Sequence, residues 1–469
     1  MTVMKKYTTI IISAFLVLGM TGCQDFLIEK PHMSLTDELA TATIEDMDKN
    51  VAGAYAYIGS GAWYSSDFII QNEMKSSNGM KHLGKSDHGY FHDEWNLNFR
   101  PDNTSPLWGT AYSIIDAANK ILVNLEGKGT EEERNNYRAE ALFMRALAHF
   151  DLVRTYALPY SYTEDHSHLG VPLILTPQAL TDQPARATVK TVYEQVINDL
   201  LEAESLIDPK YIRKGTDPHA YASVQVIQAL LSRVYLYAEE WQASADYAAK
   251  VIDSKKYSLW TKEDLKDGAC YCQDVPEKGE VIFQFYDAAE NSVRSNLFDM
   301  ATADGAYGDA ACSKSLVDLY ESDDVRSTLF KKKDGKYWSL KYGGKGLGKP
   351  DYTNVIILRL SEMYLNIAEA CVNGATGYNG VDYLNTLAES RGATPATLTK
   401  KGVFNERRKE FAWEAHLWFD HARCGYEMVR TDYEGNDKAK VVEAKDKRWA
   451  MPIPSREILV NSNLKQNEY

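Results

Sequence analysis

The sequence predicts a mostly α-helical protein in which paired helices carry long loops and a few short strands. Apolar residues recur at spacings of three and four through much of the chain, the pattern of helices with one buried face. Small residues alternate with aromatic ones across short breaks, which is typical of the packed helix pairs of tetratricopeptide-like hairpins. No low-complexity linker divides the chain, so we expect one domain after the N-terminal segment.

The helical pattern predicts eight substantial helices. The longest, 131–157, ends before Pro159, which cannot continue a helix. The pair formed by 220–239 and 241–252 shows the hairpin pattern most clearly, and the segment at 383–387 is expected to pair in the same way with the helix before it. The predicted helices span 43–58, 107–125, 131–157, 189–206, 220–239, 241–252, 355–372 and 404–424.

Two long segments do not fit a helical pattern. Residues 60–100 are rich in Gly, Asn, Ser, His and aromatic side chains, and residues 269–349 mix strand-like runs at 281–286 and 337–340 with Gly-rich turns. Loops of this length in a compact domain are usually functional or have folded structure of their own. We therefore look for ligand-binding residues in these two segments.

The first 22 residues have the layout of a bacterial lipoprotein signal. Lys5 and Lys6 precede an apolar run at 10–20 that is too short to span a bilayer, and small residues lead up to Cys23. Cleavage before Cys23 would leave its thiol to carry diacylglycerol, so we expect an exported protein anchored by lipid rather than by a helix. An ordinary secretory signal followed by a chance cysteine is the alternative, because a methionine stands where such signals usually have leucine.

Composition restricts the partners. The net charge of −14 argues against nucleic acid and against broad docking on anionic lipid. The chain also has thirty tyrosines and nine tryptophans. Their rings suit core and interface positions, and they also provide the flat amphipathic surfaces that a sugar-binding site needs.

Five cysteines follow Cys23, and an odd number leaves at least one thiol free. Cys371 and Cys424 lie in strongly helical sequence, which favours the core. We expect at most one disulfide, with Cys312 and either Cys270 or Cys272 as the better candidate, because a loop between the last two would be very tight.

Four stretches resemble the SusD/RagB family of nutrient-binding lipoproteins. They are the segment that starts at Cys23 (CQDFL), residues 354–370 (NVIILRLSEMYLNIAEA), residues 406–425 (ERRKEFAWEAHLWFDHARCG) and the C-terminal residues 450–469 (AMPIPSREILVNSNLKQNEY). These motifs are long and stand in the order that the family has. The resemblance covers essentially the whole mature chain.

The resemblance implies a SusD-like fold over 23–469, with an N-terminal part at about 23–210 and a C-terminal part at about 270–469. It also implies an outer-membrane lipoprotein that acts as a lid on a SusC-like TonB-dependent barrel. Such proteins capture oligosaccharides, or in some members peptides, and pass them to the barrel without chemistry. We therefore expect no catalytic residue and no cofactor. Surface export is a looser expectation, based on Gln24, Asp25 and Glu29.

Three carboxylates near the C-terminus allow an enzyme hypothesis. Glu406, Glu410 and Glu414 lie four apart, which on a helix places neighbouring Cβ atoms about 5–6 Å apart and so overlaps the carboxylate separation of a retaining glycosidase. Catalytic carboxylates must face a scissile bond from two walls of a cleft, whereas these share a predicted helix with Arg407 and Arg408. We expect ion pairing within the scaffold instead.

One loop collects metal-ligand side chains, namely His82, Asp87, His88, His92 and Asp93. The spacing of His88 and His92 would suit zinc on a helix, but the neighbouring glycines favour a loop. We therefore expect loop polarity or hydrogen bonding to a sugar rather than a metal. Nucleophile-elbow, phosphate-loop and zinc-protease signatures are absent from the sequence.

Aromatic and amide side chains in the two long segments form the predicted glycan site. Rings can stack on a pyranose face while amide and guanidinium groups bond its hydroxyls. Trp95 is the leading single candidate because it has the largest ring and follows three polar residues. We expect some of the candidates to contact ligand and the others to be core. They are Trp63, Tyr64, Tyr90, Trp95, Asn96, Asn98, Arg100, Tyr286 and Tyr307.

Two functions from different classes remain. The favoured one is non-catalytic glycan capture for a transporter, and the alternative is a tetratricopeptide-type scaffold or lid that binds peptides or no glycan tightly. Glycan binding distinguishes them. The sequence does not name the glycan, because stacking on aromatic rings tolerates many sugars.

Overall fold

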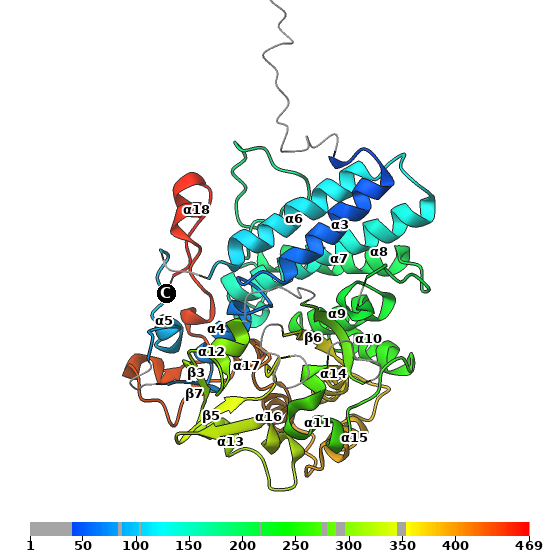
Figure 1. Cartoon of the computed structure of the whole chain (residues 1–469). Coiled ribbons are helices and arrows are strands. Elements are labelled where there is room, and N and C mark those ends of the chain that lie inside the picture. Colours follow the sequence, from blue (N-terminus) through cyan, green and yellow to red (C-terminus); the bar gives the residue numbers. More distant parts are fainter. Residues whose placement is uncertain are drawn as a thin grey trace, which may run out of the picture.

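The computed structural model describes residues 40–82, 87–102, 105–215, 217–273, 279–287, 296–344 and 353–468, and a helical scaffold dominates it (Figure 1). Cys23 and the signal segment lie outside the described residues. Successive helices of the scaffold pack against one another from α6 to α10, then α10 packs on α14 and α14 on α15. The scaffold consists of α3 (Ile44–Ile58), α6 (Leu107–Asn124), α7 (Glu131–Tyr156), α8 (Val189–Leu206), α9 (Val224–Tyr237), α10 (Trp241–Asp253), α14 (Leu360–Val372) and α15 (Gly380–Arg391).

Helix α7 is the centre of this scaffold. Thr130 starts it with a capping box in which Thr130 and Glu133 satisfy each other's backbone donors. From Ala139 to Tyr156 every residue of the helix is buried, because α6, α8 and α3 cover its sides. The charges that this burial encloses are paired, as with Arg145 and Asp199 at 2.7 Å.

The remaining helices are short. The α-helices are α4 (Asp67–Lys75), α5 (His92–Trp95), α11 (Lys262–Leu265), α12 (Asn296–Ala301), α13 (Lys314–Val317), α16 (Lys400–Glu410), α17 (Leu417–Cys424) and α18 (Ser455–Val460). The 3-10 turns are η2 (Tyr160–Tyr162), η3 (Pro218–Ala220), η4 (Lys266–Cys272), η5 (Val325–Leu329), η6 (Asp437–Ala439) and η7 (Lys447–Trp449).

Three small antiparallel sheets complete the described fold. The largest has the order β1-β3-β5-β4 and joins segments more than 200 residues apart in the sequence. Its strands are β1 (Gly79–Lys81), β3 (Ala310–Cys312), β5 (Lys336–Ser339) and β4 (Phe330–Lys333). The two-stranded sheets pair β2 (Val281–Phe285) with β6 (Val355–Arg359) and β7 (Met428–Val429) with β8 (Val441–Val442).

The predicted helix at 355–372 is wrong at its start. Its first five residues form β6, and the helix α14 begins only at Leu360. The segment Val-Ile-Ile-Leu is β-branched at three positions, which favours a strand when a partner is available. That partner is β2, which pairs with β6 in antiparallel register.

The predicted helix at 404–424 is interrupted. Helix α16 ends at Glu410 and α17 begins at Leu417, and between them Trp413 and Ala415 have left-handed φ angles of 64° and 60°. Glu414 therefore does not share a helix with Glu410. A residue distant in sequence stabilises this turn, since the buried Glu73 carboxylate accepts a hydrogen bond from the Ala415 amide at 2.8 Å.

The candidate disulfide between Cys312 and Cys270 or Cys272 is not formed, which is consistent with the expectation of at most one disulfide. Each of the five cysteines after Cys23 is a free thiol, including Cys312, Cys270 and Cys272. All three of these side chains are buried, and burial raises the pKa of the Cys312 thiol well above its usual value, so the thiol stays protonated and unreactive.

Candidate functional site

A buried ion pair joins the two long loops where β1 meets β3. Lys81 ends β1 and Asp309 precedes β3, and the Lys81 Nζ lies 3.0 Å from Asp309 Oδ2 with both side chains fully buried. Asp309 Oδ2 also accepts hydrogen bonds from the backbone amides of His88 and Tyr90, each at 3.2 Å. One carboxylate therefore fixes the backbone of a loop more than 200 residues away.

Asp87 supplies a second carboxylate to Lys81, beside the Lys81–Asp309 ion pair. Asp87 Oδ1 lies 2.6 Å from Lys81 Nζ and accepts a hydrogen bond from the Gly89 amide at 2.9 Å. The hydrogen bond from Lys81 lowers the pKa of the Asp87 carboxyl, which keeps it ionised. Gly89 has a φ of 81°, a conformation that favours glycine and turns the chain from His88 to Tyr90.

Next to the Lys81–Asp309 ion pair, His88, Tyr90 and Tyr307 form an exposed aromatic cluster. The ring centroids of Tyr90 and Tyr307 lie 5.2 Å apart at an interplanar angle of 71°, and those of His88 and Tyr307 lie 5.0 Å apart at 85°. Tyr90 is 42% exposed and Tyr307 is 36% exposed. We call these three residues the Tyr90–Tyr307 platform.

Each ring of the platform is attached to a fixed backbone. His88 Nδ1 lies 3.0 Å from Asp309 Oδ1, so the imidazole is held by the same buried carboxylate as the loop. The backbone amides of Tyr307 and Gly308 both donate to the Asp299 carbonyl, at 3.1 and 2.9 Å. Such preorganisation reduces the conformational entropy that the protein loses when a ligand binds.

The platform can bind a molecule that has both apolar faces and hydroxyl groups. Phenol rings offer an apolar face for stacking and a hydroxyl that both donates and accepts hydrogen bonds. The His88 ring presents its second nitrogen as a further polar group, since its Nδ1 already contacts Asp309 Oδ1. These are the groups with which proteins recognise sugars, and none of them forms a nucleophile paired with a base.

Trp63 and Tyr64, both predicted candidates, are core residues instead. Their side chains are almost fully buried, and the Trp63 Nε1 and the Tyr64 hydroxyl each donate to Asp151 Oδ2 at 2.7 Å. Asp151 is itself buried and bonded to Arg154. The polar atoms of both rings are therefore used within the scaffold.

Trp95, the leading candidate, also lies in the core, contrary to the expected exposed ring. It is 2% exposed and packs against Tyr433, with ring centroids 4.7 Å apart. The guanidinium of Arg430 donates to the Trp95 carbonyl, which fixes the end of α5. The residues that cover Trp95 come from a segment more than 300 positions away, so no local signal distinguished it from an exposed ring.

The polar candidates near Trp95 bond to the protein itself. Asn96 Oδ1 accepts from the Tyr433 hydroxyl at 2.9 Å, and its Nδ2 donates to the His92 carbonyl. Asn98 and Arg100 both bond to Asp93, at 3.1 and 2.9 Å. Arg100 is half exposed and Asn98 is exposed, but neither joins the platform by a contact in the described structure.

Tyr286 belongs to another part of the surface. It follows β2 and lines a pocket of about 200 Å³ with Tyr55 and Tyr221, and neither Tyr90 nor Tyr307 lines that pocket. Of the nine predicted ligand residues, Tyr90 and Tyr307 come from different long segments and are in ring contact at the surface, whereas Trp63 and Tyr64 stack on each other in the core. Sequence reasoning placed His88 in a group of metal-ligand side chains for which loop polarity or hydrogen bonding to a sugar was favoured. It did not find Lys81 or Asp309, because their pairing depends on a contact 228 residues apart.

No group of three metal-ligand side chains gathers anywhere in the described ranges. Within the loop that collects metal-ligand side chains, His88 Nδ1 lies 3.0 Å from Asp309 Oδ1, whereas the His92 Nδ1 lies 3.2 Å from the Asn96 amide nitrogen. The two histidines thus have separate partners.

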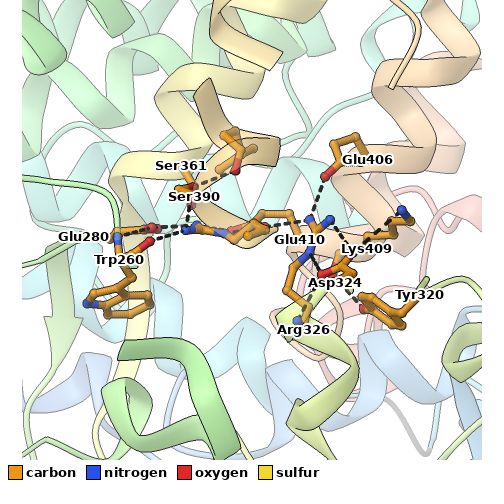
Figure 2. Close-up of polar contacts among 12 residues, drawn as sticks. Trp260, Glu280, Tyr320, Asp324, Arg326, Ser361, Ser390, Glu406, Lys409 and Glu410 are labelled. Carbon is orange, nitrogen blue, oxygen red and sulfur yellow. Dashed lines mark hydrogen bonds and ion pairs between the residues drawn. The ribbon is translucent and has the colours of Figure 1, made fainter. Parts of the chain in front are cut away.

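The three C-terminal carboxylates lie in a buried ion-pair network, and Figure 2 shows the part of it around Glu406 and Glu410. Glu406 and Glu410 both contact Arg326 Nη1, at 2.7 and 2.9 Å, and Glu410 also contacts Arg391. Glu414 pairs with Arg359 and Lys341. The expectation of ion pairing is confirmed, although the partners are not Arg407 and Arg408. These carboxylates are buried and fully paired, so they do not face a cleft.

Two protein-family models match the chain. One, described as starch-binding associating with outer membrane, matches residues 25–236, and the other, described as the SusD family, matches residues 335–469. The helical scaffold and these matches define an outer-membrane-associated carbohydrate-binding class. The chain belongs to the SusD/RagB family.

Relatives match over nearly the full length. The SusD-like protein P25 of Formosa agariphila is 23% identical over 99% of this chain and 98% of its own. A SusD superfamily protein from Bacteroides thetaiotaomicron has a TM-score of 0.82 and 28% identity, covering 91% of this chain and all of its own. A putative sugar binding protein from Bacteroides vulgatus has a TM-score of 0.81 and 26% identity, covering 91% and 98%. Within the described ranges no helix is long and apolar enough to cross a membrane.

Proposed function

We propose that this protein is a non-catalytic lipoprotein that captures oligosaccharides at the Tyr90–Tyr307 platform and delivers them to a SusC-like TonB-dependent transporter. The observation that carries the proposal is the exposed pair of rings held on the buried Lys81–Asp309 ion pair. A sugar binder gains most from rigid aromatic surface, because sugar hydroxyls are already well solvated. The platform provides such a surface.

Two further findings support this function over catalysis. The family description names starch binding at the outer membrane, and a putative sugar binding protein has a similar fold over its whole length. The carboxylates that could have formed a glycosidase pair, Glu406 and Glu410, are buried against Arg326 and do not face a ligand.

Replacing Tyr90 or Tyr307 by Ala should weaken oligosaccharide binding by about 1–3 kcal/mol, the range of an interface anchor on truncation. The melting temperature should stay near that of the wild type, because both rings are substantially exposed. Isothermal titration with a panel of oligosaccharides, after an affinity-gel screen for a ligand, measures the effect.

The matched control for this experiment is Tyr57→Ala. Tyr57 lies on α3 and is 45% exposed, so it tests whether loss of any exposed tyrosine weakens binding. We expect the control to bind as the wild type does. Unchanged affinity in both Tyr90→Ala and Tyr307→Ala would show that the ligand binds elsewhere, with the pocket beside Tyr286 as the next region to test.

The membrane attachment is proposed to be the lipid on Cys23 alone. Cys23→Ala should therefore move the protein from the membrane fraction to the soluble fraction without unfolding it. Fractionation in a strain without the transporter measures this, and retention at the membrane there would contradict it. Protease accessibility on whole cells tests whether the protein faces the exterior.

Delivery to a transporter requires a separate test. We expect the protein to co-purify with a SusC-like barrel and expect uptake of the bound oligosaccharide to fall when either partner is deleted. Normal uptake in a strain that lacks this protein would remove the delivery role while leaving glycan binding intact.

A further inference from the structure

A basic hairpin borders the loop that carries Tyr307. Strands β4 and β5 are joined by a tight turn at Asp334 and Gly335, with left-handed φ angles of 47° and 78°. Four of the six hairpin residues at 331–336 are lysines, although the whole chain has a net charge of −14. They are Lys331, Lys332, Lys333 and Lys336.

Strand register places three of the four lysines on one face. Lys331 and Lys333 alternate with Lys332, and their cross-strand partners are Trp338 and Lys336. Because cross-strand partners share a face, Lys331, Lys333 and Lys336 lie on the same side as Trp338. Lys332 lies on the other side, with its Nζ 5.3 Å from the Tyr337 ring centroid.

That face of the hairpin contacts the Tyr307 loop. The Trp338 Nε1 donates to the Gly308 carbonyl at 3.0 Å, and Lys333 Nζ donates to the Ala303 carbonyl at 2.7 Å. Lys331 Nζ pairs with Asp304 at 2.6 Å. Three hydrogen bonds or ion pairs therefore link the hairpin to residues within four positions of Tyr307, so the hairpin is joined to the loop that carries one ring of the platform.

The hydrogen bond from Lys333 to Ala303 does not by itself explain why Lys333 is paired with Lys336. They are direct cross-strand partners, and like charges in that position destabilise a hairpin. Lysines on an edge strand can prevent sheet-to-sheet association, and β4 is the edge strand of its sheet. Lys336 lies on the inner strand β5, however, so edge protection does not explain it. An anionic ligand would relieve the repulsion between the two ammonium groups.

We propose that the oligosaccharide bound at the platform is anionic, and that Lys333 and Lys336 receive its carboxylate or sulfate groups. This inference rests on the proposed function and specifies its substrate class. Neutral sugar rings would stack on Tyr90 and Tyr307, while the charged substituents would lie over the adjacent hairpin. The net negative charge of the chain does not oppose this, because the hairpin is a local excess of positive charge and salt screens charges more than about 10 Å away.

The test uses two matched ligand pairs: a sulfated oligosaccharide with its desulfated form, and a uronate oligosaccharide with its carboxyl-reduced form. We expect the wild type to bind at least one charged form about tenfold more tightly than its neutral counterpart, and raising the salt from about 0.05 M to about 0.5 M should remove most of that preference. The two pairs distinguish sulfate from carboxylate. Isothermal titration provides the affinities.

The decisive variant is Lys333→Gln with Lys336→Gln, which should reduce the preference for the charged form to less than about threefold while keeping affinity for the neutral form. Its control is Lys210→Gln with Lys214→Gln, which removes the same charge from an exposed segment between α8 and α9 and should keep the preference. A preference that survives in the hairpin variant overturns the inference.

Other outcomes separate this inference from the proposed function. If the wild type binds the charged and neutral forms equally and Tyr90→Ala loses that binding, the anionic substrate class is overturned and glycan capture still stands. Binding of neither form overturns glycan capture itself. Hairpin-dependent binding to vesicles that contain anionic lipid, without any preference among glycans, assigns the lysines to a membrane surface and overturns the inference.

Discussion

Replacing Glu410 by Gln should destabilise the protein by about 3–5 kcal/mol, because it removes one charge from a buried network and leaves its partners uncompensated. Glu410 contacts three guanidinium groups, from Arg326, Arg359 and Arg391, and all four side chains are buried. These partners come from η5, β6 and α15, so the carboxylate joins elements that are distant in sequence. Chemical denaturation measures the loss.

The matched control is Glu389→Gln on α15, where the side chain is exposed. It should change stability by no more than about 0.5 kcal/mol. A loss of less than about 1 kcal/mol in Glu410→Gln would show that Glu280, Glu406 and Glu414 compensate the arginines without Glu410.

The same network predicts an acid dependence. Burial opposes ionisation of Glu410, but Arg391, Arg359 and Arg326 together hold its pKa well below the usual value. A carboxyl with a lowered folded-state pKa stabilises the fold above its unfolded pKa of about 4.5, and that contribution is lost as the pH falls through the folded value. The stability difference between wild type and Glu410→Gln should therefore narrow on acidification.

The network also explains why spacing alone was misleading at this site. The i, i+4 spacing of Glu406, Glu410 and Glu414 is compatible with a catalytic pair only if the side chains reach a cleft. Their arginine partners lie 19 to 84 positions away in sequence, so their burial follows from tertiary structure. Ion pairing was predictable from the sequence, but the identity of the partners was not.

Local patterns predicted most of the scaffold well. The helix expected at 189–206 has those bounds in the structure, because its apolar spacing and its Thr188 cap are both local signals. Non-local pairing decided the failures. The strand β6 depends on β2, some 70 positions earlier, and the break after Glu410 depends on Glu73.

For the candidate site, too, local sequence signals predicted one part and tertiary contacts decided the rest. Composition identified the two loops, and the structure brings Tyr90 and Tyr307 from them into contact. Composition could not rank the rings within a loop, because Trp95 is covered by Tyr433 and Tyr64 is bonded to Asp151. Ring size is a poor guide to exposure, since large aromatic residues contribute most when buried.

The surroundings of Trp418, which lies on α17, indicate a structural role. Its side chain is 1% exposed and packs against Trp449, with ring centroids 4.5 Å apart. The buried Lys75 Nζ lies 5.2 Å from the centroid of the Trp418 ring. Burial lowers the pKa of Lys75 to about 7, and the charge of Glu94 opposes this shift. The Trp418 ring face also favours the charged form of Lys75.

Trp418→Ala should therefore cost about 3–5 kcal/mol, the range for truncating a buried tryptophan, because a cavity opens where α17 packs against Trp449 and α4. Trp418→Phe keeps a ring beneath Lys75 and leaves a smaller cavity, so it should lose less unfolding free energy than Trp418→Ala. Chemical and thermal unfolding of the three proteins measure the order wild type, Phe, Ala. A melting temperature of the Ala variant close to that of the wild type would contradict this prediction and would mean that the segment repacks around the cavity. Glycan affinity should remain unchanged in both variants, because Trp418 does not touch the platform.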